Sequence, residues 1–251
     1  MADTAPVALV TGAAHRLGAK TAQTLHARGW NLIIHYRSQH LKAEALAGDL
    51  NQTRPGSAVT LQADLSNLAE VQQLAEQSVA LWGRLDGLVN NASVFENDRL
   101  DSATRDSWDA HLNVNLRAPL VLTQSFMAAL PGGAEGNVVN LLDQQVLNPG
   151  AGFLSYTVSK VGLWTLTRTL ALELAPTVRV NGIGPGPALP SKRQSDDQFA
   201  AACAHLPLGR GTTPDEICRA LRFILESPAM TGQMIALDGG EHLISPTPPS
   251  G

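Results

Sequence analysis

The sequence predicts an α/β protein in which a parallel sheet is covered by helices on both faces. Short apolar runs of strand length alternate along the chain with longer stretches of helical spacing. The short runs are rich in β-branched residues and show no polar alternation, which is typical of strands buried on both sides. Because crossovers between parallel strands are right-handed, we expect a single-domain, doubly wound, Rossmann-type sheet.

The expected elements follow one another in a regular order. The predicted strands are residues 7–11, 31–36, 58–62, 87–90, 137–141, 178–183 and 234–237, and the predicted helices are residues 16–28, 41–51, 68–82, 107–130, 153–174 and 214–226. No internal repeat or linker is visible, so residues 1–251 are predicted to form one domain. Residues 185–198 are rich in Pro, Ser and charge, and we interpret 185–210 as a mobile lid over the site. The tail, 245–251, is expected to be disordered.

The composition narrows the class of protein. The chain has 251 residues, of which 44% are hydrophobic, and a net charge of −4, which does not favour nucleic acid or an anionic membrane as partner. No apolar run reaches the ~20 residues of a membrane span, and the N-terminus lacks a signal peptide. Cys203 and Cys218 are most simply free thiols in a reducing compartment, although a disulfide stays open. The seven histidines show no metal-ligand spacing, so we expect no metal. Because the sequence shows neither a membrane span nor a signal-peptide pattern, we expect a cytoplasmic protein.

A loop of small residues follows the first strand. Residues 11–18, TGAAHRLG, lie between a strand and a helix, where the backbone can approach a pyrophosphate at the helix N-terminus. An ordinary strand-to-helix turn is the alternative. The carboxyl ends of parallel strands share one edge, so this loop should form one crevice with residues 36–38, 64–65, 90–93, 141–143 and 184–190.

The end of the second strand indicates the cofactor. No carboxylate is present there to bind a ribose 2′-hydroxyl, whereas Arg37 and Ser38 can bind a 2′-phosphate. We therefore predict NADP(H), unless Arg37 is only a solvated surface arginine. Asp64 follows the third strand, where it can lie near the adenine or merely cap the next helix.

A phenol and an ammonium group lie four residues apart at Tyr156 and Lys160, on one face of a predicted helix. A nearby cation favours phenolate, so we expect Lys160 to lower the pKa of Tyr156 from ~10 and to make it a general acid or base.

With these motifs in order, the chain resembles the short-chain dehydrogenase/reductase family over nearly its whole length. The resemblance is carried by residues 11–18, Asn90-Asn91-Ala92, Asn115, Tyr156 with Lys160, Val180-Asn181 with Pro185-Gly186, and Asp238-Gly239-Gly240. It implies that Asn115 is a fourth catalytic residue and that Pro185-Gly186 lies near the nicotinamide. It also implies a homotetramer, which is common in the family.

The sequence departs from that family at one position that bears on chemistry. Thirteen residues before Tyr156, where the family usually has a serine, stands Asp143. An ionised carboxylate only accepts hydrogen bonds and would repel a developing alkoxide. Ketone reduction is therefore disfavoured, and a substrate with N–H groups and a reducible C=N bond fits better. The alternative is that Asp143 merely caps a turn in an inactive relative.

Two further departures from the family pattern, together with Asp143, point to one subgroup of the family. Arg16 replaces a usual glycine, and Phe95 follows the Asn-Asn-Ala-Ser run, so that the pattern resembles the pteridine reductases. The alternatives are that Arg16 points to solvent and that Phe95 packs under a loop. The resemblance implies that Phe95 and the nicotinamide enclose a pterin, that Ser93 and Arg16 contact pterin and cofactor, and that Asp143 and Tyr156 supply protons. Pro187-Ala188-Leu189-Pro190 lacks a serine that other members of the subgroup have.

The candidate residues form three overlapping sets. The catalytic set is Asp143, Tyr156, Lys160 and Asn115, and the substrate set is Arg16, Ser93, Phe95, Asp143 and Tyr156. The cofactor set is Gly12, Arg16, Leu17, Gly18, His35, Tyr36, Arg37, Ser38, Asp64, Leu65, Asn91, Ala92, Ser93, Leu141, Tyr156, Lys160, Pro185 and Gly186. We expect an NADPH-dependent reductase of a pterin or dihydropterin. Two alternatives are another NADP(H)-dependent reductase of a carbonyl or imine substrate and a non-catalytic dinucleotide sensor.

Overall fold

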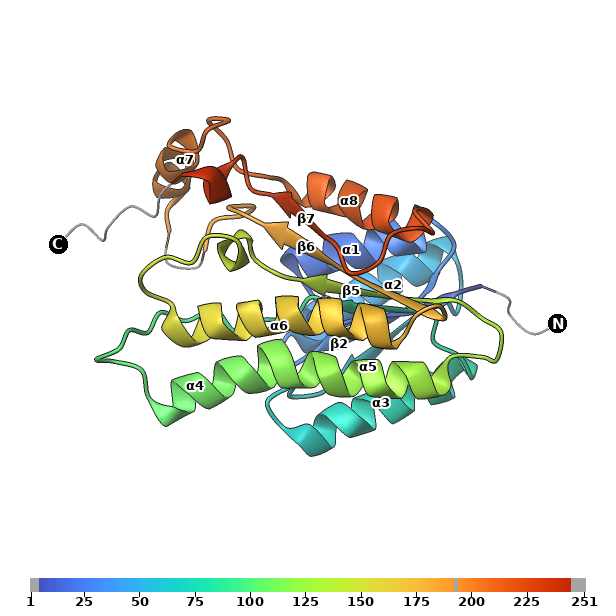
Figure 1. Cartoon of the computed structure of the whole chain (residues 1–251). Helices are drawn as coiled ribbons and strands as arrows, with labels where there is room; N and C mark the ends of the chain where they lie inside the picture. Colours follow the sequence, from blue (N-terminus) through green and yellow to red (C-terminus); the bar gives the residue numbers. More distant parts are fainter. Residues whose placement is uncertain (1–4, 192–193, 245–251) are drawn as a thin grey trace.

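The computed structural model describes residues 5–191 and 194–244, and its centre is a seven-stranded parallel sheet (Figure 1). The strands are β1 Val7–Val10, β2 Asn31–Tyr36, β3 Ala58–Gln62, β4 Gly87–Asn90, β5 Gly136–Leu141, β6 Val178–Pro185 and β7 Met234–Leu237. Their order in the sheet is β3-β2-β1-β4-β5-β6-β7, so the order reverses between β1 and β4. This is the predicted doubly wound sheet, and its reversal point is where such sheets bind ligands.

Helices cover both faces of the sheet. They are α1 Arg16–His26, α2 His40–Thr53, α3 Leu68–Trp82, α4 Arg105–Leu112, α5 Ala118–Ala129, α6 Leu154–Glu173, α7 Asp196–Ala204 and α8 Pro214–Glu226, with short helices η1 Asn113–Arg117, η2 Gln144–Val146 and η3 Glu241–Leu243. In Figure 1, α3, α5 and α6 lie on one side of the strands and α1, α2 and α8 on the other. The predicted strands and long helices are therefore confirmed, and their bounds differ from the predicted ones by a few residues at most. The exception is the helix predicted at 107–130.

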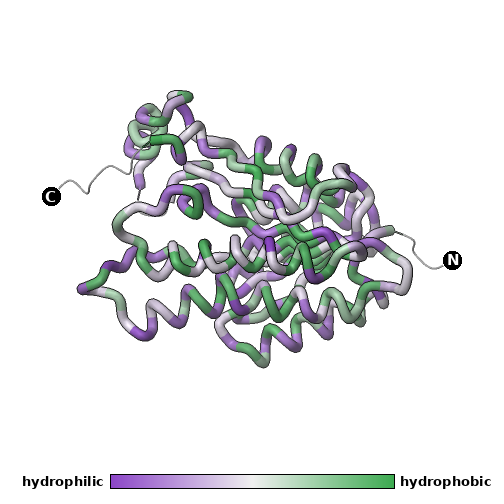
Figure 2. Tube along the Cα trace, viewed as in Figure 1, coloured by the Kyte–Doolittle hydropathy of each residue, from purple (hydrophilic) through white to green (hydrophobic). Residues whose placement is uncertain are grey.

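Two hydrophobic layers hold this arrangement together. Along β1, Ala8 and Val10 face the layer that contains α1, α2 and α8, whereas Val7 and Leu9 face the layer that contains α3, α5 and α6. Successive side chains of a strand point to opposite faces, so each strand has to be apolar on both. Figure 2 shows hydrophobic residues concentrated along the central strands and hydrophilic ones on outer loops.

The structure corrects one prediction of secondary structure and adds one helix. The single helix predicted at 107–130 is interrupted by one turn of π-helix, η1, between α4 and α5. π-turns of this kind often mark functional sites. The 185–210 segment, interpreted as a mobile lid, contains a helix that the sequence did not predict, α7, whose first turn is closed by a capping box between Ser195 and Gln198. Whether the lid moves stays a prediction.

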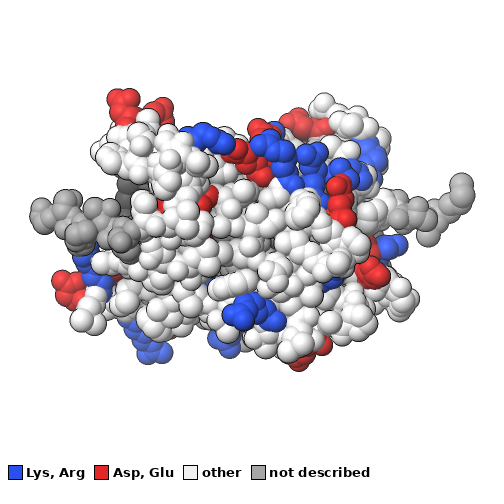
Figure 3. All heavy atoms as spheres, turned by 45° about the horizontal axis from the view of Figure 1, so that its top comes forward, with Lys and Arg blue, Asp and Glu red and all other residues white. Residues whose placement is uncertain are grey.

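Surface charge, helix hydropathy and the state of the cysteines bear on the classes of protein that the composition disfavours. On the side of the molecule shown in Figure 3, acidic and basic side chains lie next to one another. One ion pair joins Lys20 of α1 to Asp215 of α8. Among the described residues, no helix combines the length and hydropathy that a membrane crossing requires. Cys203 and Cys218 are buried free thiols. The predicted tail, 245–251, lies outside the described residues.

Candidate active site

The glycine loop after β1 has the close backbone contacts that a phosphate cradle requires. Gly12 has a φ of +63°, and a Cβ added there would lie 3.0 Å from Cα of Ala92. A Cβ on Gly18 would lie 2.3 Å from the carbonyl oxygen of Gly12. Asn91 holds the loop, because its Nδ2 donates to the carbonyl of Thr11 at 2.8 Å. Only glycine fits the two positions, so the backbone stays accessible at the N-terminus of α1.

His35 supports this loop from below, which corrects its assignment as a direct cofactor contact. Its side chain is only 2% exposed, and both ring nitrogens are engaged. The backbone N–H of Gly12 donates to Nδ1 at 3.0 Å, and Nε2 lies 3.1 Å from the carbonyl oxygen of Ala63. Because an N–H can only donate, Nδ1 must be the acceptor and Nε2 must hold the proton. Burial lowers the pKa of His35 to about 4, which keeps the ring neutral.

The C-terminal end of β2 presents one exposed cation beside the loop. Arg37 and Ser38 are exposed, and no carboxylate stands with them in Tyr36–Ser38. Tyr36 is buried instead, with its hydroxyl 2.9 Å from Nδ1 of His40, so its side chain belongs to the core. The arrangement leaves Arg37 and Ser38 to meet an incoming anion.

Asp64 and Leu65 follow β3 and differ in what they can contact. Oδ1 of Asp64 accepts from the backbone N–H and the hydroxyl of Ser66 at 2.9 and 2.7 Å. Burial raises the pKa of Asp64, but these hydrogen bonds outweigh it, and the pKa is lowered overall. The alternative that Asp64 caps the next helix is wrong, because Asn67 caps α3. The Leu65 side chain is buried in the core and packs with the layer that contains α3, α5 and α6.

Tyr156 and Asp143 form a direct pair. The Tyr156 hydroxyl donates to Oδ2 of Asp143 at 2.6 Å, and the Gln145 backbone N–H donates to Oδ1 at 2.9 Å. Burial raises the pKa of Asp143, although the hydrogen bond from Tyr156 acts in the opposite direction. Burial and the nearby Asp143 carboxylate raise the pKa of Tyr156 well above 10. The expectation that Lys160 lowers the pKa of Tyr156 is therefore wrong, and the phenol keeps its proton near neutral pH.

Lys160 lies one turn along α6 from Tyr156, on the same face, as predicted. Its Nζ donates to the carbonyl oxygen of Leu141 at 2.7 Å and lies 5.8 Å from the centre of the Tyr156 ring. Burial lowers the pKa of Lys160 to about 8. The carbonyl at the end of β5 thus aims the ammonium group at the edge of the site, beyond the reach of a hydrogen bond to the phenol.

Asn115 connects three elements of the site. It lies in η1, where Nδ2 donates to Oγ of Ser159 at 3.0 Å and to the carbonyl of Val94 at 3.0 Å. Its Oδ1 accepts from the Val94 backbone N–H at 2.8 Å and from Oγ of Ser93 at 3.2 Å. The side chain is fully engaged and buried, so it fixes the loop after β4 against α6.

Arg16 joins the glycine loop to the 185–210 lid. It has a φ of +54°, which is unusual for a residue with a side chain. Its guanidinium group donates to the carbonyl of Pro190 at 3.0 Å. Strained backbone of this kind is found where the surrounding structure holds a residue in a required place, which here is the mouth of the cavity.

Phe95 presents a flat surface at the same mouth. One face stacks on Phe153, with the ring centres 4.6 Å apart and the planes 5° from parallel. Its ring centre also lies 4.7 Å from that of Tyr156, in an edge-on arrangement. Phe95 is 47% exposed, which leaves apolar area open to a flat ligand. Phe153 was missed at the sequence level. Its φ of +49° could not be foreseen from its place at the start of a predicted helix.

These side chains meet around one cavity of about 280 Å³. It is lined by Arg16, Leu17, Asn91, Ser93, Phe95, Leu141, Leu142, Asp143, Tyr156, Lys160, Pro185 and Gly186. The predicted substrate set and three of the four predicted catalytic residues therefore lie together. Gly12, Gly18 and Ala92 form the adjoining loop, and Arg37 with Ser38 lies beside it. Asn115 supports the cavity from behind.

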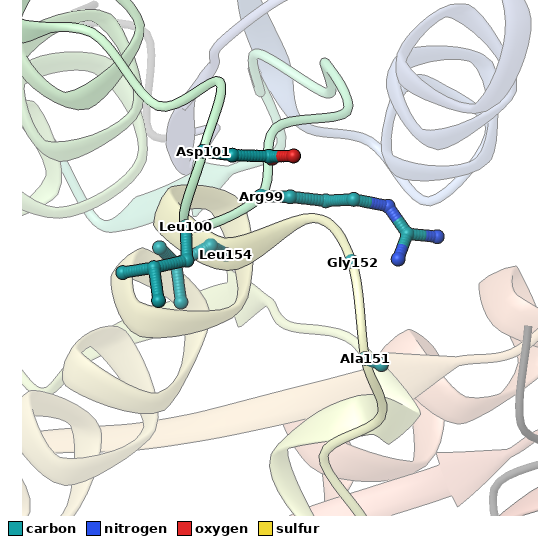
Figure 4. A pocket seen from close by; sticks show the side chains of 6 residues that line it. All are labelled: Arg99, Leu100, Asp101, Ala151, Gly152 and Leu154. Carbon is teal, nitrogen blue, oxygen red and sulfur yellow. The ribbon is translucent and has the colours of Figure 1, made fainter.

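A second cavity, of about 470 Å³, opens at the outer end of the two loops that carry Phe95 and Phe153 (Figure 4). Leu100 and Leu154 lie on one side, and the Arg99 side chain extends past Gly152 on the other. Within residues 5–191 and 194–244, no cluster of three or more His, Cys, Asp or Glu side chains is arranged to bind a metal ion.

Comparison with known proteins places this geometry among reductases. Residues 12–242 match the family model described as enoyl-(acyl carrier protein) reductase. Pteridine reductase 1 of Leishmania tarentolae is 34% identical, with 96% of this chain and 97% of the relative covered. The 3-oxoacyl-[acyl-carrier-protein] reductase of a Synechocystis strain is 30% identical, with 94% and 97% covered. A crystal structure of FolM alternative dihydrofolate reductase 1 from Brucella suis, in complex with NADP, superposes with a TM-score of 0.92 at 42% identity and covers 99% of both chains.

Proposed function

The chain belongs to the short-chain dehydrogenase/reductase family, and we propose that it reduces the C=N bond of a dihydropterin or of dihydrofolate with NADPH. The observation that carries the proposal is the 2.6 Å hydrogen bond from the Tyr156 hydroxyl to Asp143, in the cavity that Phe95 borders. The pteridine reductase of Leishmania tarentolae and the alternative dihydrofolate reductase of Brucella suis support it as relatives over nearly the whole chain.

The residues present fit NADP(H). A Cβ at Gly12 or Gly18 would collide with the neighbouring backbone, so the two glycines allow the tight loop that would hold a pyrophosphate. Arg37, exposed after β2, would bind the 2′-phosphate. Arg16, Leu17, Asn91, Ser93, Leu141, Lys160, Pro185 and Gly186 line the space for the rest of the molecule. Gly12, Ala92, Ser38 and Asp64 complete the proposed contacts, whereas His35, Tyr36 and Leu65 contribute through the fold. When bound, NADPH supplies the hydride.

Tyr156 acts as the acid. Because burial and Asp143 raise its pKa well above 10, the phenol arrives at the reaction with its proton in place. When a hydride adds to the carbon of the C=N bond, the ring nitrogen gains the electron pair and can take the proton of Tyr156. The adjacent Asp143 carboxyl group can hold a proton or return one to Tyr156. Lys160, fixed by its hydrogen bond to the Leu141 carbonyl, would bind a hydroxyl of the nicotinamide ribose.

Asp143 disfavours the reaction of ordinary ketones. A developing alkoxide needs a hydrogen-bond donor, and an ionised carboxylate offers none. A pterin instead presents N–H groups that donate to Asp143. Phe95 packs against the flat ring, while Ser93 and Arg16 meet its polar edge, and the lid at 185–210 closes the mouth of the cavity through the bond from Arg16 to Pro190.

A second candidate is reduction of a carbonyl or imine substrate. The 30% identity to an oxoacyl reductase favours it, but the carboxylate at 143 counts against the carbonyl case. A non-catalytic sensor is not favoured, because Tyr156, Lys160 and Asn115 are all in place. The proposed assembly is a homotetramer, in keeping with the family resemblance, and the proposed location is the cytoplasm.

The deciding experiment measures NADPH oxidation with dihydrobiopterin, dihydrofolate and dihydromonapterin, and with an oxoacyl thioester as the comparison. Turnover of at least one pterin and little of the thioester is expected. Asp143→Ser should lower pterin turnover and raise thioester turnover. Turnover of the thioester alone would assign the chain to the second candidate.

A further inference from the structure

Behind the cavity lies a carboxyl group that the proposed chemistry has not used. Glu241 begins η3, and its Oε2 is buried without a hydrogen-bond partner among the described residues. A Cβ added to Gly186 would lie 3.0 Å from this oxygen. Gly186 lines the cavity, so the Glu241 carboxyl lies directly behind the cavity wall. The rest of the Glu241 side chain is partly exposed.

Within residues 5–191 and 194–244, no cation forms an ion pair with Oε2 of Glu241. η3 packs against η2, the helix that follows Asp143. Asp238 lies before η3, and it is engaged by the His242 ring at 2.6 Å and by the backbone N–H groups of Gly240 and His242 at 3.0 and 2.8 Å. The two cations of the cavity are used elsewhere, since Lys160 donates to the Leu141 carbonyl and Arg16 donates to the Pro190 carbonyl.

Carboxyl groups whose charges act on one another in a buried place cannot both ionise freely. Burial, and after it the charges of Asp143 and Asp238, raise the pKa of Glu241 to about 7. Burial also raises the pKa of Asp143. Groups coupled in this way release their protons as a pair.

We propose that Asp143 and Glu241 hold one proton between them near neutral pH, and that Glu241 is the positioning residue through which the site regains the proton used in each turnover. The proposal rests on the proposed function. Each reduction places a hydride on the ring carbon and a proton on the ring nitrogen, and the C=N bond becomes C–N with an N–H. The proton comes from the Tyr156–Asp143 pair. Glu241 replaces it, directly or through one water, and takes a new proton from solvent at its exposed side.

The first test compares pH profiles of kcat with the best pterin for wild type and Glu241→Gln. The amide keeps the shape of the side chain but removes its charge and its proton. Without the like charge, Asp143 loses its proton at lower pH. The alkaline limb should move down by about one unit, which is about a tenfold loss of rate above the limb, while the rate at acidic pH is kept.

Two variants make this test specific. Glu241→Ala removes the same charge without an amide beside Gly186 and should give the same shift. Glu173→Gln removes one carboxylate from the exposed end of α6 and should leave the profile in place. An unmoved limb in both Glu241 variants, with melting temperatures like that of wild type, would overturn the proposal. A changed ratio of NADP⁺ to NADPH affinity without a moved limb would also overturn it, because Glu241 would then act on the cofactor charge.

A second readout does not depend on pterin turnover. Calorimetry of NADPH binding near pH 7, in two buffers with different ionisation enthalpies, counts the protons taken up. An anionic ligand beside the carboxyl pair should cause uptake by wild type that is lost in Glu241→Gln. Equal uptake in both proteins would contradict the shared proton even if no pterin were a substrate, whereas failure of the pterin assay alone would contradict only the proposed function.

Discussion

The stability of the protein should fall in mild acid because of one buried histidine. His35 accepts the Gly12 N–H at Nδ1, so protonation of the ring removes that acceptor and buries a charge. Its pKa is about 4 in the folded protein, against 6.5 for an unperturbed histidine. The unfolded chain therefore binds more protons between about pH 6.5 and 4, and stability is lost as the pH falls through that window. Above pH 6.5 the group contributes no pH dependence.

The size of the effect follows from the two pKa values. Between pH 7.5 and 4.5, His35 alone should lower the free energy of unfolding by about 2.5 kcal/mol, at about 1.4 kcal/mol per unit of pKa difference. The assay is urea unfolding at a series of pH values and at one protein concentration, for wild type and for His35→Asn. Asparagine offers an acceptor oxygen near the place of Nδ1 and does not titrate.

The comparison concerns slopes and not absolute stabilities. His35→Asn loses the donor to the Ala63 carbonyl, so it is expected to be less stable than wild type at pH 7.5, with a smaller further loss on acidification. His205→Asn is the matched control, because His205 is exposed, and it should keep the wild-type slope. Parallel stability curves for wild type and His35→Asn from pH 7.5 to 4.5 would refute the reasoning.

Three further substitutions test the site. Tyr156→Phe should lower kcat at least a hundredfold with NADPH affinity changed less than about threefold, because only the proton donor is deleted, and near-normal turnover would refute the assignment. Arg37→Asp should weaken NADPH binding by about 1.5–3 kcal/mol and NADH binding much less, as measured by titration with each cofactor. An unchanged preference for NADPH over NADH would show that Arg37 does not bind the 2′-phosphate. Gly18→Ala places a Cβ 2.3 Å from the Gly12 carbonyl and should lower stability by about 1–3 kcal/mol and weaken NADPH, whereas Gly48→Ala in α2, with nothing within 4 Å, should stabilise the protein slightly in thermal melts.

The sequence predicted the secondary structure well wherever hydrophobic burial decides it. Six of the predicted strands and helices have the predicted bounds, namely 31–36, 58–62, 68–82, 87–90, 214–226 and 234–237. α7 was missed because it carries few buried residues, and a capping box between Ser195 and Gln198 starts it without a strong apolar stripe. The π-turn η1 was missed because Asn115 has to reach Val94 and Ser159 at once, and no local pattern announces such a need.

The candidate site was predicted in its membership but not in its electrostatics. Spacing along α6 places Tyr156 and Lys160 on one face, and spacing from β5 places Asp143 near them. The direction of the Tyr156 pKa could not follow from that spacing, because it depends on how deeply the phenol is buried and on a 2.6 Å contact between different elements. Phe153 and Glu241 entered the site for the same kind of reason, through contacts with Phe95 and Gly186.

The sequence by itself determined the class of fold and pointed to a candidate cofactor loop and candidate reacting groups, because these depend on periodicity, on small residues and on side-chain chemistry that are local properties of the chain. Only the tertiary structure decided which groups keep their protons. Desolvation and the distance between charges depend on segments far apart in the sequence. They keep the proton on Tyr156, keep His35 neutral and leave Oε2 of Glu241 without a hydrogen-bond partner among the described residues.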